Sequence, residues 1–272
     1  MIQFSVITIN FNNASGLEKT IQSVINQTSK NFEYIIIDGG STDESNEIIN
    51  NHSNNITYFI SEKDKGIYDA QNKGIKIAKG NFLIFLNSGD CFADSNVLKD
   101  VEQFNSGKQV KLIYGNTNLI NKDDSITKLI PPDTLNLNFW YMNTLNHQAV
   151  FAHKSLFNEI GNFSMNYRFA SDFEFIFKAY RKYPNDFIHA DLTVCNYDNS
   201  GLTSNVETED FIITEREEIL KANTCRKEFY AMRSAYFKTV SLKKKYSFYL
   251  RQNIFLKNTV KPIYDFLKKI IR

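Results

Sequence analysis

Two short apolar runs, each followed by a carboxylate, constrain the fold of this chain more than any other feature. Asp38 directly follows the run at residues 34–37, and Asp90 comes four residues after the run at residues 82–86. Short apolar runs that lead at once into Gly, Ser and Asp are typical of buried strands in a parallel sheet. Because ligands of open α/β sheets bind beyond the carboxyl ends of the strands, the two aspartates predict a site for a polar ligand, with or without a metal ion.

Strand-like and helix-like segments alternate through the first third of the chain. We expect strands at about 3–10, 32–38, 56–60 and 82–86, and helices near 14–27, 43–51 and 68–78. Strands that alternate with helices of this length form βαβ units, which build a parallel sheet. The predicted fold class is therefore α/β.

Beyond Asp90 the order of the elements changes. A helix near 95–104 is followed by strand candidates around 110–115, 117–121 and 126–130. Turn signals at Gly115-Asn116 and at residues 122–124 separate these candidates. Further along we expect helices at about 153–160 and 171–182, a strand near 186–197, and helical structure after a polar loop at 198–201.

The composition is that of an ordinary globular protein. The chain has 272 residues, of which 42% are hydrophobic and 23% charged, enough for one large α/β domain with an appendage or for two smaller domains. The three cysteines are far apart and lack a CxxC pattern, which favours a reducing compartment over a disulfide framework or a zinc site. Residues 1–10 resemble a strand rather than a secretory signal, so a cytoplasmic location is expected.

Positive charge is concentrated at the C-terminal end. Residues 226–272 hold thirteen Lys and Arg against two acids, whereas residues 1–225 hold 19 bases and 28 acids. From Pro262 onward, the apolar residues fall on one face of a predicted helix and the basic residues lie off that face. Such a helix can lie in a membrane interface. A helix that packs on the core is the alternative, and the length of the basic segment favours membrane contact.

Candidate ligand-binding residues follow the first two expected strands. Phe11 is placed to stack on a nucleobase, although a core phenylalanine is the more common role. The carboxylate of Asp38 can accept a hydrogen bond from a base N–H, and the two glycines after it permit close approach of a ligand. A simple βα turn with a helix cap explains the segment at 38–43 equally well.

Two further segments carry groups suited to a diphosphate and a metal ion. Lys65 lies beside Gly66 near a helix N-terminus, a combination that favours an anionic diphosphate; a solvated lysine is the alternative, which we prefer for Lys73. Residues 87–90 offer one carboxylate, Asp90, together with neutral oxygens. Mg²⁺ and Mn²⁺ often bind to such a set when substrate phosphates complete the ligand shell. A tight turn is the competing explanation.

Two candidates for proton transfer lie later in the chain. Asp172 is expected near the start of the helix at 171–182, where the helix dipole keeps a carboxylate ionised and able to act as a general base. A common preference for acids at helix N-termini explains this residue equally well. His147, beside Gln148, is a secondary candidate, because a lone histidine is more often structural.

Taken in order, these segments resemble the family 2 inverting glycosyltransferases of the GT-A fold, of the bacterial O-antigen, capsule or exopolysaccharide type. The resemblance covers roughly residues 3–205 and rests on residues 6–8, 38–43, 66–74, 86–90, 147–148 and 170–174.

The resemblance implies a Rossmann-like, mostly parallel sheet flanked by helices. The implied GT-A catalytic domain spans 1–215, with nucleotide-sugar binding in about 1–105 and the acceptor side in about 106–215. A basic, amphipathic helical extension at 216–272 would follow it.

The resemblance also implies roles for individual residues. Thr8, Phe11 and Asp38 would hold the uracil of a UDP-sugar, Asp90 would bind the metal ion, and Asp172 would be the catalytic base. Asp172 would deprotonate the acceptor hydroxyl for a single in-line displacement, so that the anomeric configuration inverts. The implied donor-binding residues are Thr8, Asn10, Phe11, Asp38, Ser41, Lys65, Gly66, Asp69, Asn72, Ser88 and Gly89, with His147 and Gln148 as secondary candidates.

The chain departs from the family pattern at Asn87 and Gly89, where acids usually precede the last aspartate. We therefore expect Mn²⁺ or Mg²⁺ to bind together with the donor diphosphate. The implied enzyme is a metal-dependent hexosyl- or N-acetylhexosaminyltransferase, located on the inner face of the cell membrane as a peripheral protein. Its acceptor would be a polyprenyl-diphosphate-linked saccharide; we expect no nucleic-acid partner and leave a homo-oligomer open.

Two other classes of protein compete with this interpretation. A dinucleotide-dependent oxidoreductase is set aside, because it needs GxGxxG after the first strand and residues 8–16 contain only Gly16. A membrane-associated sugar-nucleotide-binding or scaffold protein without catalysis stays open, because acids are absent at positions 87 and 89. Asp90 and Asp172 argue against that alternative.

Overall fold

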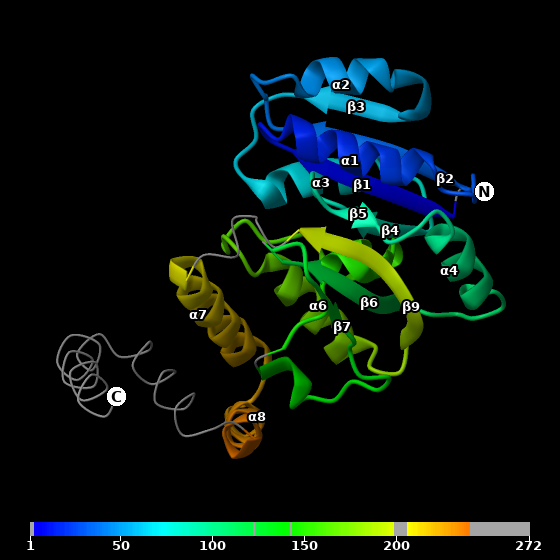
Figure 1. Cartoon of the computed structure of the whole chain (residues 1–272). Coiled ribbons are helices and arrows are strands. Elements are labelled where there is room, and N and C mark those ends of the chain that lie inside the picture. Colours follow the sequence, from blue (N-terminus) through cyan, green and yellow to red (C-terminus); the bar gives the residue numbers. More distant parts are fainter. Residues whose placement is uncertain (1–2, 122, 142, 199–205, 240–272) are drawn as a thin grey trace. The chain divides into compact units, whose positions relative to one another are not determined.

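Nine strands in the described part of the chain form one mixed sheet, in the order β3-β2-β1-β4-β8-β6-β9-β5 with β7 attached to β6 (Figure 1). The computed structural model describes residues 3–121, 123–141, 143–198 and 206–239. The strands are β1 (Phe4–Asn10), β2 (Phe32–Asp38), β3 (Tyr58–Ser61), β4 (Phe82–Phe85), β5 (Cys91–Phe92), β6 (Leu112–Ile120), β7 (Ile126–Leu129), β8 (Val150–His153) and β9 (Phe187–Asp198).

The described residues divide into two compact units. The first contains the sheet and takes in the described residues of Met1–Leu135 and Thr144–Ser204; the second takes in the described residues of Asn136–Asn143 and Asn205–Arg272. The boundary expected at residues 215–216 falls inside helix α7 (Val206–Asn223), and residues 136–143 of the expected acceptor side belong to the second unit.

The N-terminal part of the sheet is parallel, as predicted. Strand β1 pairs in parallel with β2 on one side and with β4 on the other, and β2 pairs in parallel with β3. Strand β8 then pairs antiparallel with β4 and with β6, so that the complete sheet is mixed. All seven residues of β1 are buried because both faces of the sheet are covered by helices.

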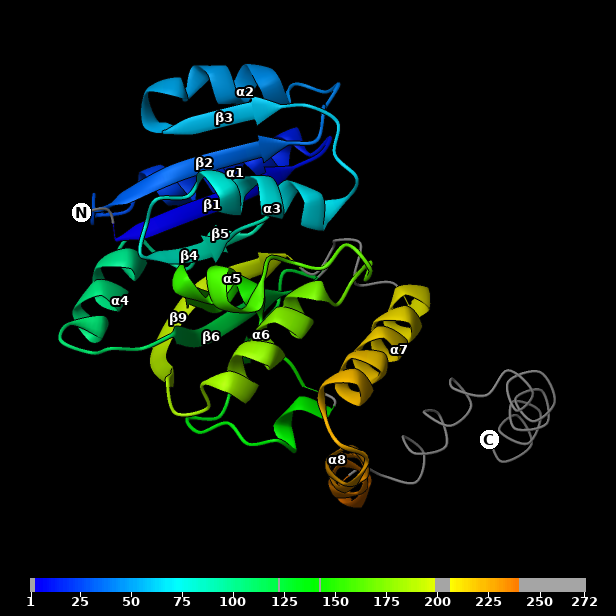
Figure 2. The same ribbon diagram turned by 180° about the vertical axis from the view of Figure 1, so that it is seen from behind.

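Helices cover both faces of the sheet in the first unit (Figures 1 and 2). Leu17 and Ile21 of α1 join Val6 of β1 and Ile36 of β2 in the core on one face. On the other face α3 packs so close to β1 that a Cβ atom on Gly74 would lie 2.6 Å from a methyl group of Ile7. The helices of this unit are α1 (Ala14–Ile25), α2 (Ser45–Asn51), α3 (Ile67–Ile77), α4 (Val97–Asn105), α5 (Ser155–Ile160) and α6 (Ser171–Lys182), with 3₁₀ turns η1 (Ser53–Asn55) and η3 (His147–Ala149).

The turn predicted at Gly115-Asn116 is wrong. Strand β6 runs without interruption through both residues, and its pairing with β9 shifts register there. A Cβ atom on Gly115 would lie 2.6 Å from a methyl group of Val194 and 2.8 Å from the carbonyl oxygen of Leu192. The glycine is therefore explained by the close approach of β9 at an irregularity in the sheet, not by a chain reversal.

The helix predicted to begin at about 153 begins at Ser155 instead, because strand β8 occupies residues 150–153. This strand was not predicted. It is only four residues long, and the sequence gives no turn signal between it and the helix that follows.

The second unit contains helices α7 and α8 (Arg226–Thr239) and the 3₁₀ turn η2 (Phe139–Tyr141). The hydroxyl of the buried Tyr141 donates a hydrogen bond to the carboxylate of Glu217, and its ring centroid lies 5.9 Å from that of Phe229. Residues 136–143 are thus attached to the C-terminal helices. The amphipathic helix expected from Pro262 onward lies outside the described residues, and none of the helices described is long and apolar enough to cross a bilayer.

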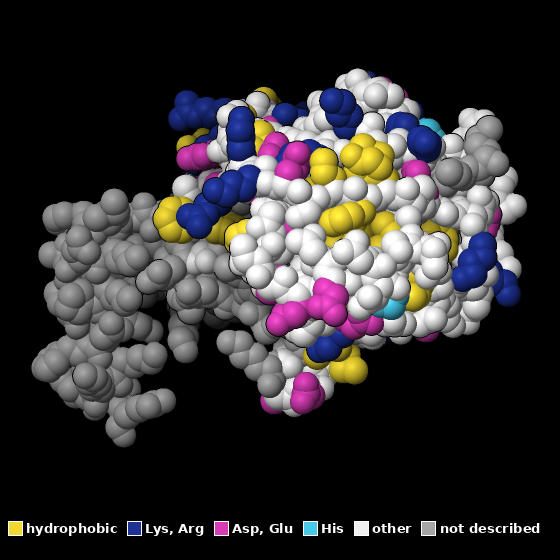
Figure 3. Space-filling view, turned by 90° about the horizontal axis from the view of Figure 1, so that it is seen from above, with side chains coloured by type: hydrophobic (Ala, Val, Ile, Leu, Met, Phe, Trp, Pro, Cys, Tyr) yellow, Lys and Arg dark blue, Asp and Glu magenta, His cyan; other side chains and the backbone are white. Residues whose placement is uncertain are grey.

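Surface charges are mixed on the face shown in Figure 3. Basic, acidic and hydrophobic side chains are interspersed there. The segment with the largest excess of positive charge in the sequence, residues 240–272, is not among the described residues.

Gly80, between α3 and β4, provides a test of how closely the sheet and its connections pack. A Cβ atom at this position would lie 2.5 Å from the backbone nitrogen of Ser5 and 2.6 Å from the carbonyl carbon of Phe4. Because the neighbouring atoms are backbone, Gly80→Ala is expected to lower the free energy of unfolding by about 1–3 kcal/mol. Urea denaturation measures the change, with Lys79→Ala as an exposed neighbouring control; equal stabilities of the two variants would contradict the packing.

Candidate functional site

The polar ends of β1 and β2 lie side by side at the edge of the sheet. Asn10 and Asp38 are register partners in the parallel pair, and the Asn10 Nδ2 donates to Asp38 Oδ1 at 2.7 Å. Strand β1 is flanked by β2 and β4, so the chain reverses the order of strands at this point. Ligands of open α/β sheets bind in the crevice at such a switch point.

Asp38 shapes the loop that follows it. Its carboxylate accepts hydrogen bonds from the Ser41 backbone nitrogen at 2.8 Å, the Ser41 Oγ at 2.5 Å and the Ser61 Oγ at 2.6 Å. Burial alone would raise the pKa of Asp38, but the hydrogen bonds from Ser41 and Ser61 lower it, so the group is ionised at neutral pH. Asp38 is fully buried, and its described hydrogen bonds are to the protein itself.

The other predicted uracil-binding residues lie at different depths. Thr8 is fully buried and its hydroxyl lies 3.1 Å from that of Tyr34, whereas the side chain of Phe11 is 63% exposed. The exposure of Phe11 excludes the core interpretation and leaves the ring accessible. A Cβ atom on Gly39 would lie 3.2 Å from the Phe11 ring and 2.7 Å from the Asp64 carboxylate, so the glycine allows these two side chains to come close.

The start of helix α3 is held by two carboxylates. Asp64 Oδ1 accepts from the Gly66 backbone nitrogen at 2.9 Å, and Asp69 Oδ2 accepts from the Lys65 backbone nitrogen at 2.9 Å. Gly66 has φ +117°, a conformation that favours glycine. The Lys65 residue is exposed.

Asp90 is a buried carboxylate with few compensating donors. Gln148 Nε2 donates to Asp90 Oδ2 at 3.2 Å, and the Asp198 backbone nitrogen donates to Oδ1 at 3.3 Å. Burial raises the pKa of Asp90 to about 6, although the positive charge of His147 and the Gln148 hydrogen bond oppose the increase. A carboxylate in this state gains more from a nearby cation than an exposed one does.

Ser88 and Gly89 are fixed by backbone contacts next to Asp90. The Gly89 nitrogen donates to Thr20 Oγ1 at 2.9 Å, and the Ser88 hydroxyl donates to the Ile9 carbonyl oxygen at 3.2 Å. Gly89 has φ +109°, a conformation that favours glycine at this position.

Asp172 is held from two sides in the first turn of α6. Its Oδ1 accepts a hydrogen bond from the Tyr68 hydroxyl at 3.0 Å, and its Oδ2 lies 3.1 Å from His147 Nδ1. The Tyr68 hydroxyl in turn accepts from the Ser171 backbone nitrogen at 3.0 Å. The carboxylate thus has a fixed orientation, and Tyr68 connects it to the start of α3.

His147 links the two predicted acids electrostatically. Burial would lower the pKa of His147, but its hydrogen bond to Asp172 and the charges of Asp172 and Asp90 raise it. Its Nε2 lies 3.4 Å from Asn87 Nδ2. The secondary candidates His147 and Gln148 therefore contact Asp172 and Asp90, respectively.

A further carboxylate, Asp198, lies beside the predicted metal-binding loop. A Cβ atom on Gly89 would lie 3.8 Å from Asp198 Oδ2, and the buried Asn87 Oδ1 has no hydrogen-bond partner in the described part of the chain. Sequence reasoning missed Asp198, although it ends a strand just as Asp38 does.

The oxygens at this loop fit a hard divalent cation that also binds substrate phosphates. Among the residues described, no group of three or more His, Cys, Asp or Glu side chains could hold a metal ion without such a partner.

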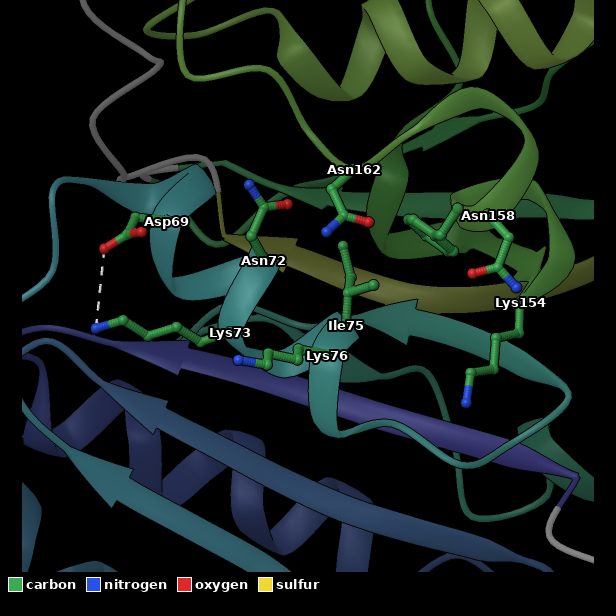
Figure 4. A pocket seen from close by; sticks show the side chains of 9 residues that line it. Asp69, Asn72, Lys73, Ile75, Lys76, Lys154, Asn158 and Asn162 are labelled. Atoms are coloured by element: carbon green, nitrogen blue, oxygen red, sulfur yellow. Dashed lines mark ion pairs between the residues drawn. The ribbon is translucent and has the colours of Figure 1, made fainter.

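Two predicted donor-binding residues line a different cavity. Asn72 forms two hydrogen bonds with the backbone of Phe163, with Nδ2 donating at 2.9 Å and Oδ1 accepting at 3.0 Å. Asn72 and Asp69 both line a pocket between α3 and α5 (Figure 4). Neither Asp38 nor Asp90 lines it.

Comparisons with known proteins agree with the order of the motifs. The sequence model of the family described as Glycosyl transferase family 2 matches residues 5–173. The PGL/p-HBAD biosynthesis glycosyltransferase of Mycobacterium bovis (strain BCG / Pasteur 1173P2) is 28% identical over 214 residues, covering 77% of this chain and 82% of that protein. An uncharacterized glycosyltransferase of Mycobacterium tuberculosis (strain CDC 1551 / Oshkosh) is 34% identical over 207 residues, covering 75% of this chain and 78% of that protein.

Solved structures share the fold at low sequence identity. S. aureus TarS aligns with a TM-score of 0.67 and 18% identity over 94% of this chain and 49% of its own, so the present chain spans about half its length. TarS 1–349 in complex with UDP-GlcNAc aligns with a TM-score of 0.65 and 18% identity, over 90% of this chain and 78% of its own. The mannosyltransferase PcManGT from Pyrobaculum calidifontis, in complex with GDP-Man and Mn²⁺, aligns with a TM-score of 0.63 and 13% identity, over 89% of this chain and 76% of its own.

The raised pKa of Asp90 predicts how stability changes with pH. Its carboxyl holds a proton more tightly in the native state, with a pKa of about 6, than in the unfolded chain, where the usual aspartate pKa is 3.8. This contribution stabilises the native state at low pH and is lost as the pH rises from about 4 to about 6. Asp90→Asn has no titrating carboxyl at this position, so it does not lose this stabilisation. Between pH 4 and 7.5, the free energy of unfolding of the variant should therefore rise relative to that of the wild type, by up to about 3 kcal/mol.

Urea denaturation at both pH values measures this difference. Asp94→Asn, which neutralises an exposed carboxylate four residues after Asp90 in the sequence, is the control and should show a smaller dependence of stability on pH. A stability difference between Asp90→Asn and wild type that does not change with pH would contradict the buried, uncompensated state of Asp90.

Proposed function

Because the chain belongs to glycosyl transferase family 2 and has the GT-A fold, we propose that it is an inverting glycosyltransferase that moves a sugar from a UDP-sugar to a hydroxyl group of a saccharide. The observation that carries this proposal is the arrangement around Asp172. That carboxylate is fixed by Tyr68 and His147, and His147 is also coupled to the buried Asp90.

The uridine is proposed to bind at the ends of β1 and β2. The exposed Phe11 ring supplies a stacking surface. The buried Thr8, Asn10 and Asp38 are proposed to act by holding the loop at 39–43 in place, with Ser41 bonded to Asp38. Relatives of the same fold support a nucleotide-sugar donor, since TarS 1–349 was solved with UDP and with UDP-GlcNAc.

The diphosphate is proposed to lie between the start of α3 and the loop before Asp90. The exposed Lys65 and the backbone at Gly66 supply positive charge on one side, and Ser88 and Gly89 lie on the other. Asp90 and Asp198 would hold a Mn²⁺ or Mg²⁺ ion that neutralises the charge of the departing diphosphate. One solved relative of the fold was obtained with Mn²⁺.

Asp172 is proposed as the general base. Its orientation is set before substrate binds, which lets one carboxylate oxygen approach the acceptor hydroxyl as that hydroxyl attacks the anomeric carbon. Tyr68 and His147 act as positioning residues, because they contact Asp172 and need not contact the sugar. A single displacement converts an α-linked donor into a β-linked product.

The acceptor is proposed to be a polyprenyl-diphosphate-linked saccharide at the inner face of the cell membrane, in the synthesis of O-antigen, capsule or exopolysaccharide. The transferred unit would be a hexose or an N-acetylhexosamine. The basic segment at 226–272 supports this location, since each Lys or Arg near an anionic bilayer contributes about 1 kcal/mol of attraction.

Release of UDP from a panel of UDP-sugars with Mn²⁺ tests the enzymatic proposal. Asp172→Asn should reduce turnover by about 10²- to 10⁴-fold, because it removes a general base but keeps the size of the side chain. Glu174→Gln is the matched control, since Glu174 lies in the same helical turn but forms an ion pair with Lys178 at 2.6 Å. UDP-sugar binding with no turnover in wild type, even with a lipid-linked acceptor, would instead favour a binding or scaffold protein.

The metal proposal predicts that ion and donor bind together. Calorimetry should show weak Mn²⁺ binding to the protein alone and at least tenfold tighter binding in the presence of UDP, since the protein supplies few of the ligands. Asp90→Asn and Asp198→Asn should each weaken this UDP-dependent binding, while Asp94→Asn should not. Tight Mn²⁺ binding without UDP would overturn the proposed ligand set.

The membrane proposal concerns residues 240–272, which hold nine Lys and Arg against one acid. A chain that ends at Thr239 keeps the buried Phe229 and Met232 of α8 in place. It should no longer float with phosphatidylglycerol vesicles, whereas the full chain should float with these and not with phosphatidylcholine vesicles. Unchanged flotation of the shortened chain would refute the role of the segment.

A further inference from the structure

A pocket of about 450 Å³ lies between α3 and α5, entirely within the first unit (Figure 4). Its volume is in the range of small-molecule binding sites, roughly 300–1,000 Å³. It is lined by Asp69, Asn72, Lys73, Ile75, Lys76, Lys154, Phe157, Asn158 and Asn162. None of these residues takes part in the proposed metal-binding or base chemistry.

The pocket lies along α3, the helix that also carries Tyr68. Asp69 directly follows Tyr68, whose hydroxyl donates to Asp172. Lys76 lies eight residues beyond Tyr68 on α3, which corresponds to about 12 Å along the helix axis. An acceptor of several sugar units with one hydroxyl at Asp172 would have to extend over this distance to bring a distal sugar into the pocket.

The far end of the pocket carries positive charge without acidic partners. Lys73 is neutralised by Glu62 at 2.9 Å and lies 3.8 Å from Asp69. In the described part of the chain, neither Lys76 nor Lys154 forms an ion pair; the Lys154 ammonium donates to the Ala78 carbonyl oxygen at 2.5 Å, and Lys76 is exposed. These two ammonium groups leave the pocket cationic.

The remaining lining suits a hydroxylated ring. Ile75 and Phe157 are almost fully buried and form an apolar wall of the pocket, whereas Asn158 and Asn162 are exposed at its rim. An amide group both donates and accepts hydrogen bonds, as sugar hydroxyl groups require of their partners. Apolar walls with a few polar groups are typical of sites that bind small molecules in a fixed orientation.

We propose that this pocket is an acceptor subsite for a negatively charged sugar residue, one that bears a carboxylate or a phosphate group and lies away from the reacting hydroxyl. The inference rests on the proposed glycosyltransferase function. Lys76 and Lys154 attract the negative charge from either side of Ile75 (Figure 4), and the asparagines contact the ring hydroxyls.

Binding of simple sugars to the full chain tests the subsite. The probes are glucuronate, glucose 1-phosphate and uncharged glucose, measured by ligand-observed NMR titration. The wild type should bind both anionic probes more tightly than glucose, and Lys76→Gln and Lys154→Gln should each weaken anion binding about fivefold. Lys79→Gln, the same change at an exposed lysine outside the pocket, should have no effect.

Equal binding of glucose and glucuronate, or equal effects of Lys79→Gln and Lys76→Gln, would overturn the proposal. Saturating glucuronate should leave hydrolysis of the UDP-sugar by water unchanged, because an acceptor subsite does not contact the donor. A change in that hydrolysis would identify a regulatory sugar phosphate site instead and overturn the acceptor role.

Failure of the enzymatic proposal is distinguishable from failure of the subsite. Asp172→Asn should reduce turnover by about 10²- to 10⁴-fold but leave the affinity for glucuronate unchanged. Glucuronate binding in a wild-type protein that never releases UDP would refute the glycosyltransferase, and the acceptor role with it, whereas turnover without glucuronate binding would refute the subsite alone.

Discussion

The parallel pairing of β1 with β2 on one side and with β4 on the other is the constraint on which the candidate site depends. Parallel strands have their carboxyl ends at the same edge, so this pairing brings Asn10, Asp38 and the loop at 87–90 to one place. The connecting helices are forced onto the two faces of the sheet, which buries β1 completely. Helix α3 then begins at the same edge and carries Tyr68 to Asp172.

The two strand-end aspartates are both buried, yet they face opposite electrostatic situations. Asp38 is compensated by hydrogen bonds from Ser41 and Ser61, which lower its pKa against the effect of burial. Asp90 receives weaker compensation, and burial raises its pKa to about 6. The first carboxylate is suited to a structural role in the loop, and the second is suited to binding a cation.

Much of the parallel half could be predicted from sequence, because its signals are local. The helix at 171–182 and the strand at 32–38 match their predictions, since each has a strong apolar period and clear boundaries. The mixed half depends on contacts distant in sequence. Gly115 signals a turn locally, but its neighbours Val194 and Leu192 are almost eighty residues away.

The same limit applies to the site. Asp90 and Asp172 follow local strand-end and helix-start patterns, so they could be proposed as functional residues from sequence. Asp198 is the third acid at this edge, but only the pairing of β9 with β5 and β6 brings it to the loop before Asp90. Likewise, the position of Asp69 and Asn72 in a separate pocket depends on how α5 packs against α3.

The central claim is that one carboxylate, Asp172, deprotonates the acceptor for a single displacement. The anomeric configuration of the product tests this most directly, since it records the number of displacements. Proton NMR of the saccharide formed from an α-linked UDP-sugar is expected to show a β linkage. An α linkage in that product would contradict the account, because retention requires a second displacement or a different mechanism.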